Sequence, residues 1–117
     1  MKAVIEKAHS VGAVVVWELA HSAEAVPVDV HGTDLDFAIG CIYKYLNDAP
    51  GTPAFIYVAP HLLETVEPFL CGWYGHEALF AFDTDYRPMP NKIERMRIGT
   101  LLIASFALLS VALCNLG

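Results

Sequence analysis

The sequence predicts an α/β fold, on three observations in its first half. Residues 2–11 place apolar side chains at helical spacing with charges on the other side, and Gly12 follows as a stop. Residues 14–17 form a continuous β-branched and aromatic run that is typical of a buried parallel strand. Further short apolar runs lie between turn-rich segments. A helix, a glycine and a buried strand in this order make one α/β unit.

The elements after that helix follow in order. Residues 13–19 are predicted as the first strand, and a turn-rich segment follows it. The 34–37 region can hold one helical turn before a second apolar run at 37–43, where another strand is expected. Residues 55–58 are predicted as a third short strand.

The later part of the chain is less regular. Pro60 is expected to end the third strand, and residues 61–66 can begin a short helix. Residues 69–92 contain aromatics, glycines and prolines without a sustained period, which is typical of a long ordered loop. Such loops often carry functional sites.

The C-terminal segment has two interpretations. Thr100 can cap a helix over residues 101–113, with Asn115 and Gly117 as terminators. Residues 98–117 are also uncharged over a length that could cross a bilayer. No aromatic belt or basic cluster closes the far end, and α/β proteins also bury such helices, so the sequence favours a buried helix over a membrane span.

Composition indicates one small, ordered domain with a surplus of apolar surface. The 117 residues are 56% hydrophobic and 17% charged, with a mean hydropathy of +0.46. This content argues against disorder. A surplus of this kind is expected of a segment separated from the layers against which it normally packs.

Charge and cysteine content exclude several classes of function. The net charge is -6 and no basic run occurs, which argues against nucleic-acid binding. Three cysteines without CxxC spacing indicate a reducing compartment, and five scattered histidines give no metal-ligand spacing. The N-terminus lacks the apolar core of a signal peptide, so we expect a cytoplasmic protein.

Three groups of residues are candidates for a functional site. Glu18 ends a predicted buried strand, where open α/β sheets place ligand contacts, and His21 follows three residues later. Lys44 lies between two tyrosines directly after an apolar run, and a desolvated amine can condense with an aldehyde. Residues 72–76, GWYGH, place N–H and O–H donors among glycines and could hold an anion. Taken singly, each has a plainer explanation: a strand-end acid in water, a loop histidine, a snorkelling lysine, or loop packing.

Together these residues resemble the kynureninase family of fold-type-I pyridoxal-phosphate enzymes. The motifs WELAHSA, GCIYKYLN, PGTPAF, GWYGH and GT stand in that family's order with comparable separations, as far as Thr100. The resemblance implies that residues 1–117 are part of the large, cofactor-binding domain of an aspartate aminotransferase-like fold. The N-terminal half of that domain and the C-terminal small domain would be absent.

The resemblance implies two catalytic residues. Lys44 would bind pyridoxal 5'-phosphate covalently through its amine and later move protons at the substrate's Cα. Tyr43 would donate a hydrogen bond to the cofactor phosphate and act as an acid-base group during carbon–carbon cleavage.

It also implies four cofactor contacts beyond these two roles. Glu18 stands where the family has an aspartate that pairs with the pyridine nitrogen, and His21 would lie beside the ring. Trp73 would donate a hydrogen bond to the cofactor phosphate, and Thr100 matches another position of the family that contacts the cofactor. No metal ligand is implied.

The activity implied is hydrolysis of L-kynurenine or 3-hydroxy-L-kynurenine to anthranilate or 3-hydroxyanthranilate, plus alanine, by a cytosolic homodimer when the enzyme is complete. A cysteine desulfurase or another class-V aminotransferase relative is an alternative, against which the GWYGH motif argues. A non-catalytic interaction fragment, pairing with a full-length homologue or anchored through residues 98–117, is a third possibility.

The chain departs from the family at several positions. Glu18 is one methylene longer than the aspartate, Glu24 and the pair Asp48-Ala49 replace small residues, and Leu101-Leu102 replaces a proline-containing helix start. The phosphate-binding turn and the aromatic that stacks on the cofactor ring belong to the family's missing N-terminal half. We therefore expect this chain alone to show little or no kynurenine cleavage.

Overall fold

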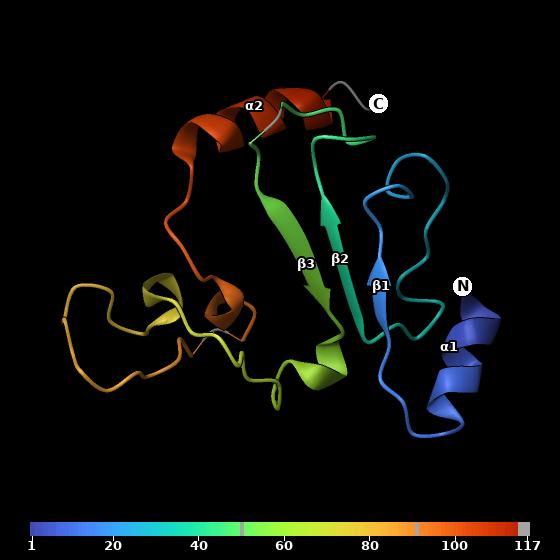
Figure 1. Cartoon of the computed structure of the whole chain (residues 1–117), viewed down its shortest axis with the longest axis horizontal. Coiled ribbons are helices and arrows are strands. Elements are labelled where there is room, and N and C mark those ends of the chain that lie inside the picture. The colour runs from blue at the N-terminus through green and yellow to red at the C-terminus, as the bar shows by residue number, and fades with distance from the viewer. Residues whose placement is uncertain (50, 91, 115–117) are drawn as a thin grey trace. The chain divides into compact units, whose positions relative to one another are not determined.

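A computed structural model describes residues 1–49, 51–90 and 92–114 of the chain, which divides into two compact units. The first unit comprises Met1–Ala59 and Leu102–Gly117, and the second comprises Pro60–Leu101. The sheet and both α-helices belong to the first unit, whereas turns and short 3₁₀ segments build the described part of the second (Figure 1).

The first unit is built on a three-stranded mixed sheet in the order β1-β2-β3. Its strands are β1 (Val16–Glu18), β2 (Phe37–Cys41) and β3 (Ala54–Val58). Strands β1 and β2 are parallel, with Glu18 opposite Ile39, and β3 runs antiparallel to β2. The predicted α/β class is confirmed, and each strand lies within about two residues of its predicted ends except the shorter β1.

A small core forms on one face of this sheet. Helix α1 (Lys2–His9) buries Ile5, which packs with Leu19, Leu35 and Ala38 in one cluster. On the same face, the ring of Phe55 occupies the space where a side chain on its strand partner Gly40 would stand. A larger residue at position 40 would therefore force the Phe55 ring to move.

The opposite face of the sheet is open among the described residues. Val16, Ile39 and Ile56 lie on neighbouring strands of that face, and all three are exposed. The prediction that residues 14–17 form a strand buried on both sides is therefore wrong for this chain, because Val14 and Val16 are 64% and 60% exposed. Helix α1 and the connection after β1 cover only one side of the sheet.

A buried carboxylate joins α1 to the start of the sheet. Asp36 is 5% exposed, and its Oδ2 accepts the Val15 N–H at 2.8 Å and lies 2.9 Å from His9 Nε2. The backbone carbonyl of Asp36 also accepts the Ala59 N–H at 2.8 Å. Asp36 thereby connects α1, the residue before β1 and the end of β3.

Two predicted helical segments are not α-helical. At 34–37 the structure has a turn over residues 31–34, and Asp34 has a φ of 56°, which is incompatible with a continuing right-handed helix. At 61–66 it has a 3₁₀ turn, Pro60–Leu62, followed by further turns. Both segments are too short for a costly helical nucleus to be stabilised by packing.

Helix α2 (Ile103–Cys114) matches the predicted C-terminal helix with a later start, but none of its residues is buried, so the expectation of a buried helix is wrong for this chain. The Phe106 N–H bonds to the Leu102 carbonyl at 3.1 Å, so the helix begins after Leu102 and Thr100 does not cap it. The predicted terminators Asn115 and Gly117 lie outside the described residues. Within the described part of the chain, no helix combines the length and the apolar character that crossing a membrane requires.

Candidate functional site

Lys44 lies in a turn just beyond the carboxyl end of β2. The Asn47 N–H donates to the Lys44 carbonyl at 3.0 Å, and the Asp48 N–H donates to the Ile42 carbonyl at 3.3 Å. Asn47 has a φ of 64°, in the left-handed region that asparagine tolerates better than most residues. The apolar strand and this turn fix where the lysine leaves the sheet.

The structure brings Lys44 together with His21 and Glu18. The Lys44 amine lies 3.0 Å from His21 Nε2 and 3.4 Å from its Nδ1, and His21 Nδ1 lies 4.0 Å from Glu18 Oε2. Glu18 Oε1 accepts the Ala20 N–H at 2.7 Å, which holds the carboxylate at the end of β1. This proximity follows from the parallel pairing of β1 and β2, which places their carboxyl ends at one edge.

Glu18 and Lys44 border one hollow of about 320 Å³, at the lower end of the size range of small-molecule sites. Its lining residues are Glu18, Ala20, Ile39, Gly40, Cys41, Tyr43, Lys44 and Ala54. An amine, a carboxylate and a phenol thus surround one space, with an imidazole beside the amine. This donor set fits a cofactor that offers an aldehyde to the amine and a ring nitrogen to the carboxylate.

The surroundings of Lys44 are wetter than the sequence predicts. Tyr43 and Tyr45 are 50% and 54% exposed, and the Lys44 amine lies 5.8 Å from the centre of the Tyr43 ring. The flanking aromatics therefore cover Lys44 only in part, and Lys44 itself is half-buried in the turn.

The GWYGH motif organises the second unit through close backbone contacts. Trp73 lies in a 3₁₀ turn, Trp73–Gly75. A side chain on Gly72 would fall onto the backbone of Ile98, and one on Gly75 would lie 2.8 Å from the Arg95 carbonyl and 2.9 Å from that of Arg97. Both glycines are needed because another part of the chain passes against them.

Replacing Gly72 with alanine is expected to destabilise the second unit by about 3 kcal/mol or more, because the backbone at Ile98 must move. Gly99→Ala is the matched control, since open space surrounds that position. Hydrogen exchange of peptides from residues 72–98 measures the effect. Equal protection in the two variants would show that the contact with Ile98 is unimportant.

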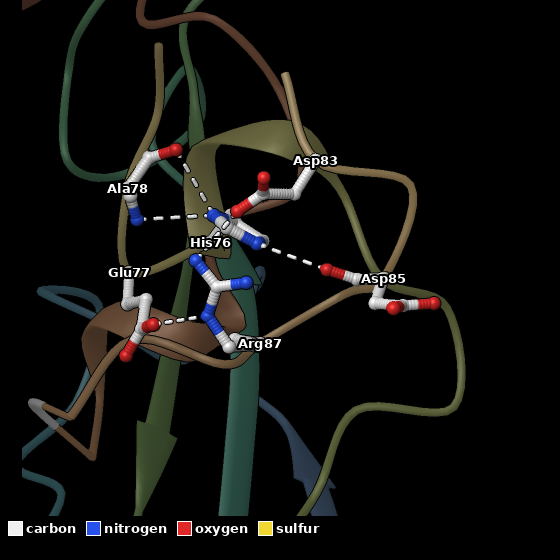
Figure 2. A network of polar contacts seen from close by, with 6 residues as sticks. All are labelled: His76, Glu77, Ala78, Asp83, Asp85 and Arg87. Atoms are coloured by element: carbon white, nitrogen blue, oxygen red, sulfur yellow. Dashed lines mark hydrogen bonds and ion pairs between the residues drawn. The ribbon is translucent and has the colours of Figure 1, made fainter. Parts of the chain in front are cut away.

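His76 holds together the loop of residues 77–87 that follows the motif. It is 8% exposed, its Nδ1 lies 3.0 Å from the Ala78 N–H nitrogen, and its Nε2 lies 3.3 Å from the Asp85 carbonyl (Figure 2). Beside it, the Arg87 guanidinium bonds to Glu77 and Asp83, and these bonds raise the pKa of Arg87 further above its usual value. The hydrogen bonds of His76 thus stabilise the loop of residues 77–87.

Tyr86 belongs to the same loop. Its hydroxyl donates to the Gly75 carbonyl at 2.9 Å, and its ring packs edge-on to His76. Burial raises the pKa of the Tyr86 phenol, and the neighbouring Cys71 thiol raises it further. The phenol therefore keeps the proton that it donates to Gly75.

Trp73 and Thr100, the two remaining predicted cofactor contacts, both belong to the second unit. Trp73 lines a hollow of about 450 Å³ together with Phe82, Tyr86 and other residues of this loop. Thr100 is exposed in an irregular segment. Their roles toward a cofactor stay predictions, as do those of Glu18, His21, Tyr43 and Lys44.

Asp36 is not among the residues that the sequence predicts to be functional, because an acid before a strand has many plainer explanations. A signal was nevertheless available, since an acidic residue directly before a buried run has backbone N–H groups within reach.

Across the described ranges 1–49, 51–90 and 92–114, no group of three or more histidine, cysteine or acidic side chains could hold a metal ion.

Comparison with known proteins places this geometry in a family. The class-V aminotransferase family model matches residues 1–116. Kynureninases from Pseudomonas fluorescens and Deinococcus radiodurans are each 47% identical over 113 residues, which is 97% of this chain. The chain spans 27% of the length of each of these relatives.

Solved structures agree on the fold. A cysteine desulfurase from Thermococcus onnurineus NA1 superimposes with a TM-score of 0.75 at 23% identity, over 98% of this chain and 28% of that one. The Escherichia coli cysteine desulfurase CsdA gives 0.73 at 29% identity, over 96% and 27%. The predicted partial large-domain fold is thereby confirmed, and the chain belongs to the class-V aminotransferase family.

Proposed function

We propose that this chain carries the cofactor-anchoring part of a pyridoxal-phosphate-dependent kynureninase, which hydrolyses L-kynurenine or 3-hydroxy-L-kynurenine. The observation that carries the proposal is the meeting of Lys44, His21 and Glu18 at the carboxyl ends of two parallel strands. The 47% identity to two kynureninases supports this reaction over that of the cysteine desulfurases, which are 23% and 29% identical.

The cofactor supplies the sink for the electrons that are released when bonds at the substrate's Cα break. Lys44 anchors it through the amine and carries protons to and from Cα. Glu18 provides the negative charge that keeps a ring nitrogen protonated, and His21 binds beside the ring. The extra methylene of Glu18 sets its carboxylate further from the strand than an aspartate, so its contact is the one most sensitive to pocket shape.

The other predicted contacts complete this proposal. Tyr43 and Trp73 donate hydrogen bonds to the phosphate, Tyr43 also serves as an acid-base group, and Thr100 contributes a further contact. The complete enzyme is proposed to act as a cytoplasmic homodimer. Because the chain spans about a quarter of its relatives, the remaining residues of that pocket would come from outside it.

The proposal is tested by adding pyridoxal 5'-phosphate to the chain, reducing with borohydride and locating the pyridoxyl group by mass spectrometry. We expect the label on Lys44, because this lysine lines a hollow that Glu18 also lines. Equal labelling of Lys2, Lys7 and Lys92 would show that no organised cofactor site exists and would refute the proposal.

A further inference from the structure

A buried carboxylate lies in the turn that follows Lys44. Asp48 is 9% exposed, and its Oδ1 accepts the Ala49 N–H at 2.7 Å. Its Oδ2 is buried too, and no group among the described residues donates a hydrogen bond to it. A buried carboxylate oxygen without a donor is costly, and native proteins nearly always supply one. Asp48 therefore has one oxygen that calls for a donor from outside the described residues.

The Asp48 side chain borders a hollow of about 390 Å³ between this turn and α2, two segments of the first unit. The same two segments are also joined where the Ser105 hydroxyl donates to the Gly51 carbonyl at 3.5 Å. The space far exceeds the roughly 30 Å³ that one water molecule occupies, and it falls within the size range of small-molecule sites. The other lining residues are Asn47, Ala49, Leu108, Val111 and Ala112.

The two walls of this hollow differ in chemistry. The turn supplies the Asp48 carboxylate and the Asn47 amide, whereas α2 supplies only the carbon side chains of Leu108, Val111 and Ala112. Leu108 and Val111 are 52% and 60% exposed, so the apolar wall can be reached from solvent. A metal cation would need several oxygen ligands, which the α2 wall does not offer. The pair of walls instead suits a positively charged N–H donor that carries a short alkyl chain.

We propose that this hollow binds a small organic cation, namely a primary ammonium group on a short alkyl chain. The ammonium donates to Asp48 Oδ2 and to the amide oxygen of Asn47, and the alkyl chain packs on Leu108 and Val111. Because Oδ2 is covered by its neighbours, the half-exposed side chains of α2 shift as the ligand enters. The net charge of -6 favours the approach of a cation.

The site is separate from the hollow beside Lys44 and does not depend on the proposed function. The two hollows share no lining residue. Asp48 is also one of the positions at which the chain departs from the family pattern, so the resemblance does not imply this site. No cofactor is needed to test it.

The test titrates the whole chain with n-butylammonium chloride and follows the backbone amide resonances by NMR. We expect saturable shifts confined to residues 47–49 and 108–112, with a dissociation constant on the order of millimolar for so small a ligand. Two parallel titrations serve as ligand controls. 1-Butanol has the same alkyl chain without the charge, and sodium chloride has a cation without the chain.

Asp48→Asn is expected to weaken binding of n-butylammonium at least about tenfold, because a hydrogen bond to a charged acceptor is lost. The substitution keeps the shape of the side chain and an oxygen for the Ala49 N–H. Leu108→Ala should weaken binding about threefold by removing part of the apolar wall. Asp29→Asn is the matched control at an exposed carboxylate of the same unit and should leave the affinity unchanged.

Three results would overturn the inference. Equal affinity in Asp48→Asn and in the unsubstituted chain would mean that the carboxylate is not the acceptor. Binding of 1-butanol as tight as that of n-butylammonium would show an apolar site only. Shifts reproduced by sodium chloride, or spread over other acidic residues, would show a general effect of ions. If Asp48→Asn does not fold, the exposed substitution Leu108→Ala decides, and an unchanged affinity there would refute the site.

Discussion

Lys44→Ala is expected to abolish pyridoxyl attachment at the site after borohydride reduction. Reduction fixes the cofactor only where an amine has condensed with its aldehyde, and Lys44 is the one lysine that lines the hollow beside Glu18. Residual labelling should fall to the level of the surface amines Lys2 and Lys7. Mass spectrometry of labelled peptides measures the change.

Two further variants make this result specific. Lys44→Arg keeps the positive charge beside His21 but cannot condense stably with an aldehyde, so it should behave like Lys44→Ala. Lys7→Ala removes an exposed lysine of α1 and should leave site labelling intact. Site labelling that survives in Lys44→Arg would place the anchoring amine elsewhere.

Asp36→Ala is expected to lower the free energy of unfolding of the first unit by about 2–3 kcal/mol. The substitution leaves the Val15 N–H without its acceptor and removes the partner of His9 on α1. A lost buried acceptor costs the desolvation of its donor, and here the acceptor is also charged. The loss should loosen α1 and β1 together.

Hydrogen exchange of peptides from residues 1–18 and 37–59 measures this effect. Asp29→Ala is the matched control, because Asp29 accepts the Gly32 N–H at 2.7 Å in an exposed turn and should cost less than about 1 kcal/mol. If the two variants exchange alike, burial of the Asp36 carboxylate contributes nothing to holding the helix on the sheet.

Local patterns in the sequence were sufficient for the positions of the strands and of the main site residues. β2 and β3 follow apolar runs that are bounded by turn residues, and their ends are set by local chemistry. For the same reason the sequence alone places Glu18 at the end of one strand and Lys44 after the next. Parallel pairing of β1 with β2 then brings the two residues to one edge.

Burial and long-range polar contacts could not be predicted in this way. Whether Val16 is covered depends on what packs against its face of the sheet, and the antiparallel direction of β3 depends on the path of the chain between strands. The bond from Asp36 to Val15 spans 21 residues, and nothing local to either residue selects it. How far Lys44 is covered depends likewise on residues distant in sequence, such as His21.

The irregular loop predicted at 69–92 agrees with the described part of the second unit, but the contacts that order this loop could not be predicted, for a related reason. Residues 69–92 have no hydrophobic period, and their order comes from particular bonds such as Tyr86 to Gly75 and His76 to Asp85. The motif that predicted a ligand contact is also a packing motif, since Gly72 and Gly75 lie against the backbone of residues 95–98. A sequence reading cannot separate those two requirements.

The fit between Gly40 and Phe55 limits how these two positions can vary. The ring stands in the place of the missing side chain, and the two residues face each other across β2 and β3. A residue larger than glycine at 40 would therefore require the Phe55 ring to move or a smaller residue to stand at 55. Among homologues the two positions should therefore vary together, with a small residue on one strand and a large residue on the other.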